Sequence, residues 1–123
     1  MPKYVLDVGN CGPDHASISR MLKQHFSVEV LQADQASDAI EKLRKQKCDL
    51  ILVNRKLDCD YSDGLDVIKE VKAEPNFAEI PTMLITNHDN YQQEALAIGA
   101  EYGFGKLELK TPETHEKLAK FLN

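Results

Sequence analysis

Asn54, Thr86 and Lys106 are the first residues whose chemistry stands out, because each follows an apolar segment of strand length. In sheets of parallel strands, ligands bind in the crevice beyond the carboxyl ends of the strands. The Asn54 amide is a poor nucleophile, since it is neutral and its nitrogen lone pair is delocalised. The side chain that ends the third segment therefore cannot act as a carboxylate nucleophile, and a plain strand-capping asparagine is the alternative interpretation.

Asp7 is a carboxylate within a segment that should be apolar. Two interpretations stay open: its side chain points into the crevice, or it is buried in the sheet beside a neighbouring donor. A buried carboxylate needs a partner in both cases.

The segment 55–64 contains three aspartates, Asp58, Asp60 and Asp63, that give it a superficial likeness to a calcium loop. The EF-hand spacing and its closing glutamate are missing. We therefore expect solvated turn carboxylates there.

The histidines and cysteines indicate neither a metal centre nor a catalytic base. The four histidines fall on separate expected elements, and the three cysteines form no CxxC pair. These residues are His15, His25, His88 and His115, with Cys11, Cys48 and Cys59. Free thiols are the expected state of the cysteines.

The composition fits one compact domain spanning residues 1–123, with 42% hydrophobic residues available for a core. A net charge of −5 argues against broad binding to nucleic acid, which needs clustered basic residues. The longest apolar runs are far too short to span a membrane and no signal peptide is evident, so we expect a soluble, cytoplasmic protein.

Strand-like segments alternate with amphipathic helical patterns along the whole chain. Strands are expected at residues 4–8, 28–31, 50–53, 81–85 and 101–104. Helices are expected after each, one opening at Gly12 and Pro13, one covering 91–98, and the last capped by Thr111. Five such units predict an α/β, flavodoxin-like, doubly wound parallel sheet of five strands in the order 2-1-3-4-5.

The chain resembles a response-regulator receiver domain of the CheY-like type over its whole length. The motifs are CDLILVN at 48–54, DGLDVIKEVK at 63–72, IPTMLITN at 80–87 and GAEYGFGK at 99–106. The resemblance implies a phosphoacceptor aspartate at the end of the third strand, an acidic pair that holds Mg²⁺ after the first, a hydroxyl after the fourth and a lysine after the fifth.

By this resemblance the phosphoacceptor position falls on Asn54, and the acidic pair falls on Asn10 and Cys11, which lack the charge that Mg²⁺ prefers. Thr86 and Lys106 match the retained hydroxyl and lysine. The five residues therefore form a degenerate phosphorylation site with no metal.

Lys106 loses its usual anionic partner in this interpretation. We expect it to hydrogen-bond the Asn54 oxygen or to pair with Asp7 or Asp58, because a buried ammonium needs a partner. Leu107 replaces the proline that follows this lysine in the family, which puts the family's cis peptide bond in doubt.

The aromatic switch position of the family falls on Gly103, flanked by Tyr102 and Phe104. These aromatics either form a partner-binding face or pack as part of an edge strand. The switch itself looks displaced or lost.

The leading hypothesis is an atypical receiver that acts as a phosphorylation-independent signalling and protein-interaction module, without enzymatic activity or cofactor. The alternative is a phosphate-accepting receiver of a two-component phosphorelay, with Asp7 or Asp58 as substitute acceptor and Mg²⁺ bound. A flavodoxin-like cofactor enzyme rests on fold analogy alone, and the sequence has no glycine-rich phosphate loop.

The resemblance implies signalling proteins as partners, among them a histidine kinase or an output protein, and neither nucleic acid nor membrane. A homodimer stays open. So does the choice between a free-standing regulator and a fragment of a longer one.

Overall fold

Five short parallel strands rich in Val, Leu and Ile form the centre of the protein, whose computed structural model describes residues 2–123. The strands are β1 (Lys3–Val8), β2 (Val28–Ala33), β3 (Leu50–Asn54), β4 (Thr82–Ile85) and β5 (Glu101–Phe104). They are ordered β2-β1-β3-β4-β5, which confirms the predicted topology.

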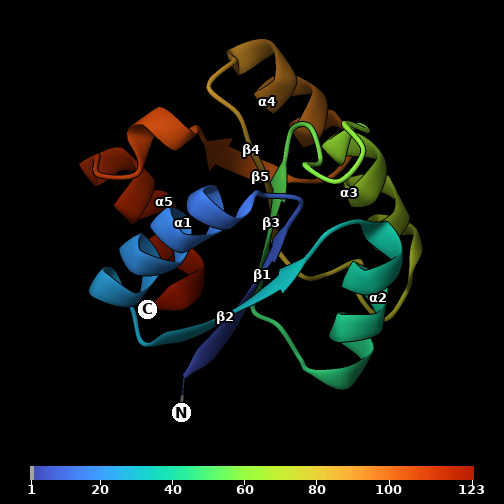
Figure 1. The fold of residues 1–123 in the computed structure, drawn as a ribbon, viewed down its shortest axis with the longest axis horizontal. Coiled ribbons are helices and arrows are strands. Elements are labelled where there is room, and N and C mark those ends of the chain that lie inside the picture. Colours follow the sequence, from blue (N-terminus) through green and yellow to red (C-terminus); the bar gives the residue numbers. More distant parts are fainter. Residues whose placement is uncertain (1) are drawn as a thin grey trace.

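Helices follow the strands in chain order and cover both faces of the sheet. They are α1 (Gly12–His25), α2 (Ala36–Lys45), α3 (Gly64–Ala73), α4 (Asp89–Ala97) and α5 (Pro112–Leu122), with a 3₁₀ turn η1 (Lys106–Glu108) before α5. Helices α1 and α5 lie on one face, while α2, α3 and α4 lie on the other (Figure 1).

Each face of the sheet has its own apolar core. Ile18 of α1 and Leu118 of α5 pack with Leu52 of β3 on one face, whereas Ile68 of α3 packs with Ile51 of β3 on the other. Alternating residues of β3 thus point to opposite cores, which explains why this strand reads as an uninterrupted apolar run.

The element ends mostly agree with the sequence prediction. Thr111 accepts a hydrogen bond from the Thr114 amide and caps α5 as expected. The second strand extends beyond its predicted end at residue 31 to Ala33, because its last residues pair with Asp7 and Val8 of β1. Helix α4 covers Asp89–Ala97 rather than 91–98.

The strand register brings the polar strand ends to one edge of the sheet. Val8 pairs with Val53, and Asn54 pairs with Ile85, so the residues that follow β1, β3 and β4 come together. Gly9 turns the chain after β1 with a φ of +82°, and a Cβ there would lie 2.4 Å from Cδ2 of Leu57. Among residues 2–123, no helix has both the length and the hydrophobicity needed to cross a bilayer.

Candidate functional site

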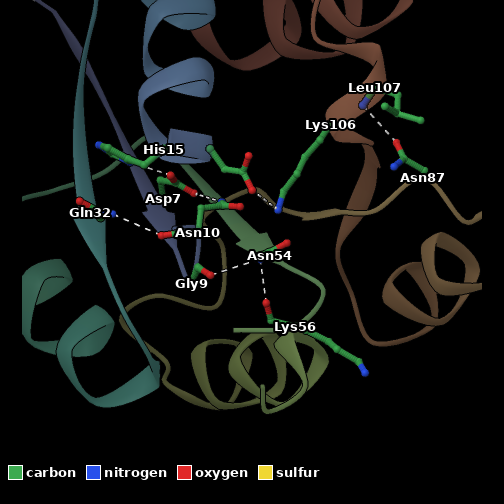
Figure 2. Close-up of polar contacts among 11 residues, drawn as sticks. Asp7, Gly9, Asn10, His15, Gln32, Asn54, Lys56, Asn87, Lys106 and Leu107 are labelled. Carbon is green, nitrogen blue, oxygen red and sulfur yellow. Dashed lines mark hydrogen bonds and ion pairs between the residues drawn. The ribbon is translucent and has the colours of Figure 1, made fainter. Parts of the chain in front are cut away.

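Asn54 ends β3 half-buried, with its amide nitrogen turned toward two backbone carbonyls (Figure 2). Nδ2 donates to the carbonyl oxygens of Lys56 at 2.7 Å and Gly9 at 3.2 Å. Carbonyl oxygens only accept hydrogen bonds, so these partners require the amide nitrogen at this position. The side chain therefore fastens the loop after β1 to the loop after β3.

Asp7 is fully buried near the end of β1 and is paired with neighbouring donors. Nδ2 of Asn10 donates to one of its oxygens, and Nδ1 of His15 lies 2.7 Å from the other (Figure 2). Burial raises the pKa of Asp7 above its ordinary value, while the hydrogen bonds from His15 and Asn10 act in the opposite direction. Of the two interpretations left open, the structure shows the buried, paired carboxylate.

The prediction for the partner of Lys106 is wrong. Its Nζ donates to Oδ2 of Asp14 at 2.7 Å, rather than to Asn54, Asp7 or Asp58. Asp14 lies in the first turn of α1 and Lys106 begins η1, so the pair joins these two elements and gives Lys106 an anionic partner. The hydrogen bond from Lys106 lowers the pKa of Asp14 below its ordinary value.

The Thr86 hydroxyl follows β4 and caps the turn into α4. Its Oγ1 accepts a hydrogen bond from the His88 amide at 3.2 Å, and its own amide donates to the carbonyl oxygen of Phe104. Cys11 is the N-cap residue of α1 without a capping hydrogen bond from its side chain.

Gln92 of α4 points toward β4 and β5, and its role was not predicted from the sequence. Its side chain is 2% exposed. Nε2 donates to the carbonyl oxygens of Leu84 at 3.0 Å and Thr86 at 3.3 Å, while Oε1 accepts from the Gly103 amide at 2.8 Å. A polar residue in an otherwise apolar helix stripe is the only signal that could have indicated it.

Gly103 stands where the resemblance places an aromatic switch, and the packing excludes any side chain there. A Cβ at this position would lie 2.3 Å from the carbonyl oxygen of Leu84. The close contact between β4 and β5 therefore requires glycine at position 103.

The two flanking aromatics differ in their surroundings. Phe104 is 1% exposed and packs in the α1–α5 core, so its prediction as part of a partner-binding face is wrong. Tyr102 lies on the surface, where it donates to Asp89 and has Nζ of Lys117 4.5 Å from its ring centroid.

A cavity of about 430 Å³ opens beyond the ends of β3 and β4, and we call it the crevice. Asn54, Thr86 and Lys106 line it together with Arg55 and Lys56, and none of its lining residues is acidic. The Arg55 guanidinium lies 3.9 Å from the centroid of the Tyr91 ring. Arg55 and Lys106 are paired with Asp63 and Asp14, which lie outside this lining. The crevice is therefore lined by basic and neutral side chains, unlike the acidic pocket that a hard metal ion prefers.

The aspartates of segment 55–64 organise its turns. Asp63 caps α3 by accepting from the Leu65 amide, and Asp60 accepts from the amide and hydroxyl of Ser62. Asp58 is exposed. Within residues 2–123, no three His, Cys, Asp or Glu side chains are grouped so as to hold a metal ion, and all three cysteines are free.

Two histidines expected on separate elements meet in the structure. The rings of His25 and His115 lie 3.8 Å apart between centroids, at the contact of α1 and α5. Because His25 and His115 lie far apart in the sequence, no local pattern predicted this contact.

The comparisons with known proteins agree with this architecture. A family model described as response regulator receiver domain matches residues 14–118. No curated protein matches the chain.

Solved structures of response regulators share the fold at low sequence identity. The chemotaxis response regulator CheY4 of Vibrio cholerae is 23% identical with a TM-score of 0.72, over 98% of this chain and 95% of that one. A receiver domain from Colwellia psychrerythraea is 21% identical with a TM-score of 0.79, over 96% of each chain. A putative response regulator from Chloroflexus aurantiacus is 19% identical with a TM-score of 0.77, over 97% and 99%.

Proposed function

This chain belongs to the family of response regulator receiver domains, and from that premise we propose that it is an atypical member that works without phosphorylation. It serves as a signalling and protein-interaction module and catalyses no reaction. The observation that carries the proposal is the Asn54 amide, which donates to the carbonyl oxygens of Gly9 and Lys56.

The bonds of Asn54 suit an amide and oppose a carboxylate. An ionised aspartate has acceptors only, so it would lose both hydrogen bonds and bring negative charge toward two carbonyl oxygens. The backbone around position 54 thus favours asparagine, and asparagine provides no carboxylate nucleophile.

The residues beside Asn54 do not fit the Mg²⁺ ion that receiver chemistry implies. Asn10 and Cys11 carry no charge, and the Asp7 carboxylate is engaged by His15 and Asn10. The lining of the crevice supplies no carboxylate to a divalent cation.

The contacts of Gln92 favour a single fixed conformation of the β4–α4–β5 region. One buried amide joins the two strands and the helix, and Gly103 leaves no room for a moving aromatic ring. A signal would then be transmitted through binding of partners to this fixed surface, where Tyr102 is exposed.

Intact mass after incubation with acetyl phosphate and Mg²⁺ tests the proposal. We expect no added mass at any pH between 6 and 8. A gain of one phosphoryl group, labile to hydroxylamine, would contradict it and favour the phosphate-accepting alternative. Peptide mapping would then show whether Asp7 or Asp58 is the acceptor, and Asp7→Asn and Asp58→Asn would each be tested for loss of the label.

A further inference from the structure

We propose that a second cavity, between α1 and α5, binds a phosphorylated small molecule of nucleotide size. This cavity, the α1–α5 hollow, measures about 730 Å³ and is lined by residues of α1, of η1 and the segment after it, and of α5. Both helices lie on the same face of the sheet (Figure 1). Its volume is within the range of pockets that bind small ligands. The inference does not rest on the proposed function.

The charge of the hollow favours an anionic ligand. Five of its lining residues are basic in type and none is acidic, although the chain as a whole carries a net charge of −5. The basic residues are Arg20, His25, Lys106, Lys110 and His115. A concave surface lined by one sign of charge concentrates its field and attracts ions of the other sign.

Free positive charge in the hollow comes mainly from two of these residues. Lys106 is already paired with Asp14, whereas Arg20 and Lys110 form no ion pair within residues 2–123. Both side chains are exposed, one on α1 and the other just after η1. Because both line the hollow and neither is held by a carboxylate, both are available to a phosphate group bound there.

The remaining lining suits the organic part of such a ligand. Met21 and Leu109 supply apolar surface, and the imidazoles of His25 and His115 present flat rings beside it. Nε2 of His115 lies 3.0 Å from the carbonyl oxygen of Leu109, so it carries a hydrogen and fixes the ring. Cationic groups next to flat and apolar surface match a nucleoside phosphate better than a bare inorganic anion.

Isothermal titration calorimetry with the intact chain tests this inference, using ADP, AMP, adenosine and pyrophosphate in Mg²⁺-free buffer of low ionic strength. We expect ADP to bind, AMP and pyrophosphate to bind more weakly, and adenosine to give no heat. The double variant Arg20→Gln/Lys110→Gln should weaken ADP binding by about ten-fold or more, because it removes the two unpaired cations.

The matched control is Lys23→Gln/Lys120→Gln, which removes the same charge from exposed positions of α1 and α5 outside the hollow. It should retain most of the affinity. Circular dichroism and a thermal melt establish that both double variants are folded.

Three results would overturn the inference. ADP and pyrophosphate could give no heat at millimolar concentration, or the two double variants could weaken ADP binding equally, which would indicate diffuse surface charge. Binding of a polyglutamate peptide in place of ADP and pyrophosphate would instead assign the hollow to an acidic protein segment.

Discussion

The Asn54 amide forms two hydrogen bonds that an ionised carboxylate could not form, and this contact could not be predicted from the sequence. The alignment of residues 48–54 placed Asn54 at the strand end correctly. It could not show that the carbonyl oxygens of Gly9 and Lys56 turn toward the same point, because loop conformation decides that.

We expect Asn54→Asp to lower the free energy of unfolding at pH 7 by about 1–3 kcal/mol, the usual cost of unsatisfied or repelled polar groups. The deficit should shrink as pH falls, because a protonated aspartic acid can donate one hydrogen bond again. Urea melts at several pH values measure both effects.

Asn87→Asp is the matched control, since Asn87 is exposed at the rim of the crevice and its oxygen accepts from the Leu107 amide. A carboxylate keeps that bond. Equal stability of Asn54→Asp and the wild type at pH 7 would refute the role given to the amide. Asn54→Asp should also stay largely unlabelled by acetyl phosphate, because the acidic pair is still missing.

The bond between Lys106 and Asp14 is a partly exposed ion pair, so its removal should cost little. We expect Lys106→Ala to lose about 1 kcal/mol or less, because solvent screens pairs of this exposure. Asp14 has a lowered pKa in the folded state, so the pair stabilises the fold above the ordinary Asp pKa of 3.8 and loses this effect as pH falls below it.

A double-mutant cycle of Lys106→Ala and Asp14→Asn in urea melts at a series of pH values measures the coupling between the two side chains. The coupling energy should be fully present at pH 7 and should decline as the pH falls through the lowered pKa of Asp14 in the folded state. A coupling that does not change with pH would show that the two side chains interact other than as an ion pair.

Among the elements, α4 is joined to both β4 and β5 by the buried side chain of Gln92. Helix patterns predict apolar residues at buried positions, so a buried amide in a helix is invisible to them. The same limit explains the error at Phe104: on an edge strand covered by helices, alternation cannot tell which aromatic faces the core. Glu101 and Tyr102 are exposed, whereas Gly103 and Phe104 are buried.

We predict that Gln92→Ala lowers the free energy of unfolding by about 2–3 kcal/mol, because buried acceptors and a buried donor lose their partners. Gln93→Ala is the matched control, since Gln93 is exposed on the same helix. Hydrogen exchange should show faster exchange of the Gly103 amide in Gln92→Ala only. If the two variants were equally stable, water would be replacing the hydrogen bonds of the Gln92 side chain, and the predicted role of Gln92 would be wrong.

For the whole molecule, the alternation of strand and helix patterns was enough to predict the sheet order, because right-handed crossovers leave few arrangements of five βα units. Contacts between distant elements were not predictable in this way. Lys106 and Asp14 are 92 positions apart, and only the packing of α1 beside the end of β5 brings them together.

Global stability should be insensitive to Mg²⁺. A ligand that binds only the folded state raises the free energy of unfolding. Over residues 2–123, no three His, Cys, Asp or Glu side chains are grouped so as to hold such an ion. The free energy of unfolding from urea melts in about 10 mM MgCl₂ should therefore equal that in KCl of the same ionic strength within about 0.2 kcal/mol. A clear increase that disappears in Asp7→Asn would make Asp7 a metal ligand.

Lys106 lines both the crevice and the α1–α5 hollow. Its single ammonium group is bonded to Asp14 and cannot at the same time bind a ligand in each cavity. Ligands in the two cavities would therefore compete for one cation. Thermodynamic linkage makes the consequence reciprocal: an occupant of one cavity that draws this ammonium changes the affinity of the other, and the second occupant changes the affinity of the first by the same factor.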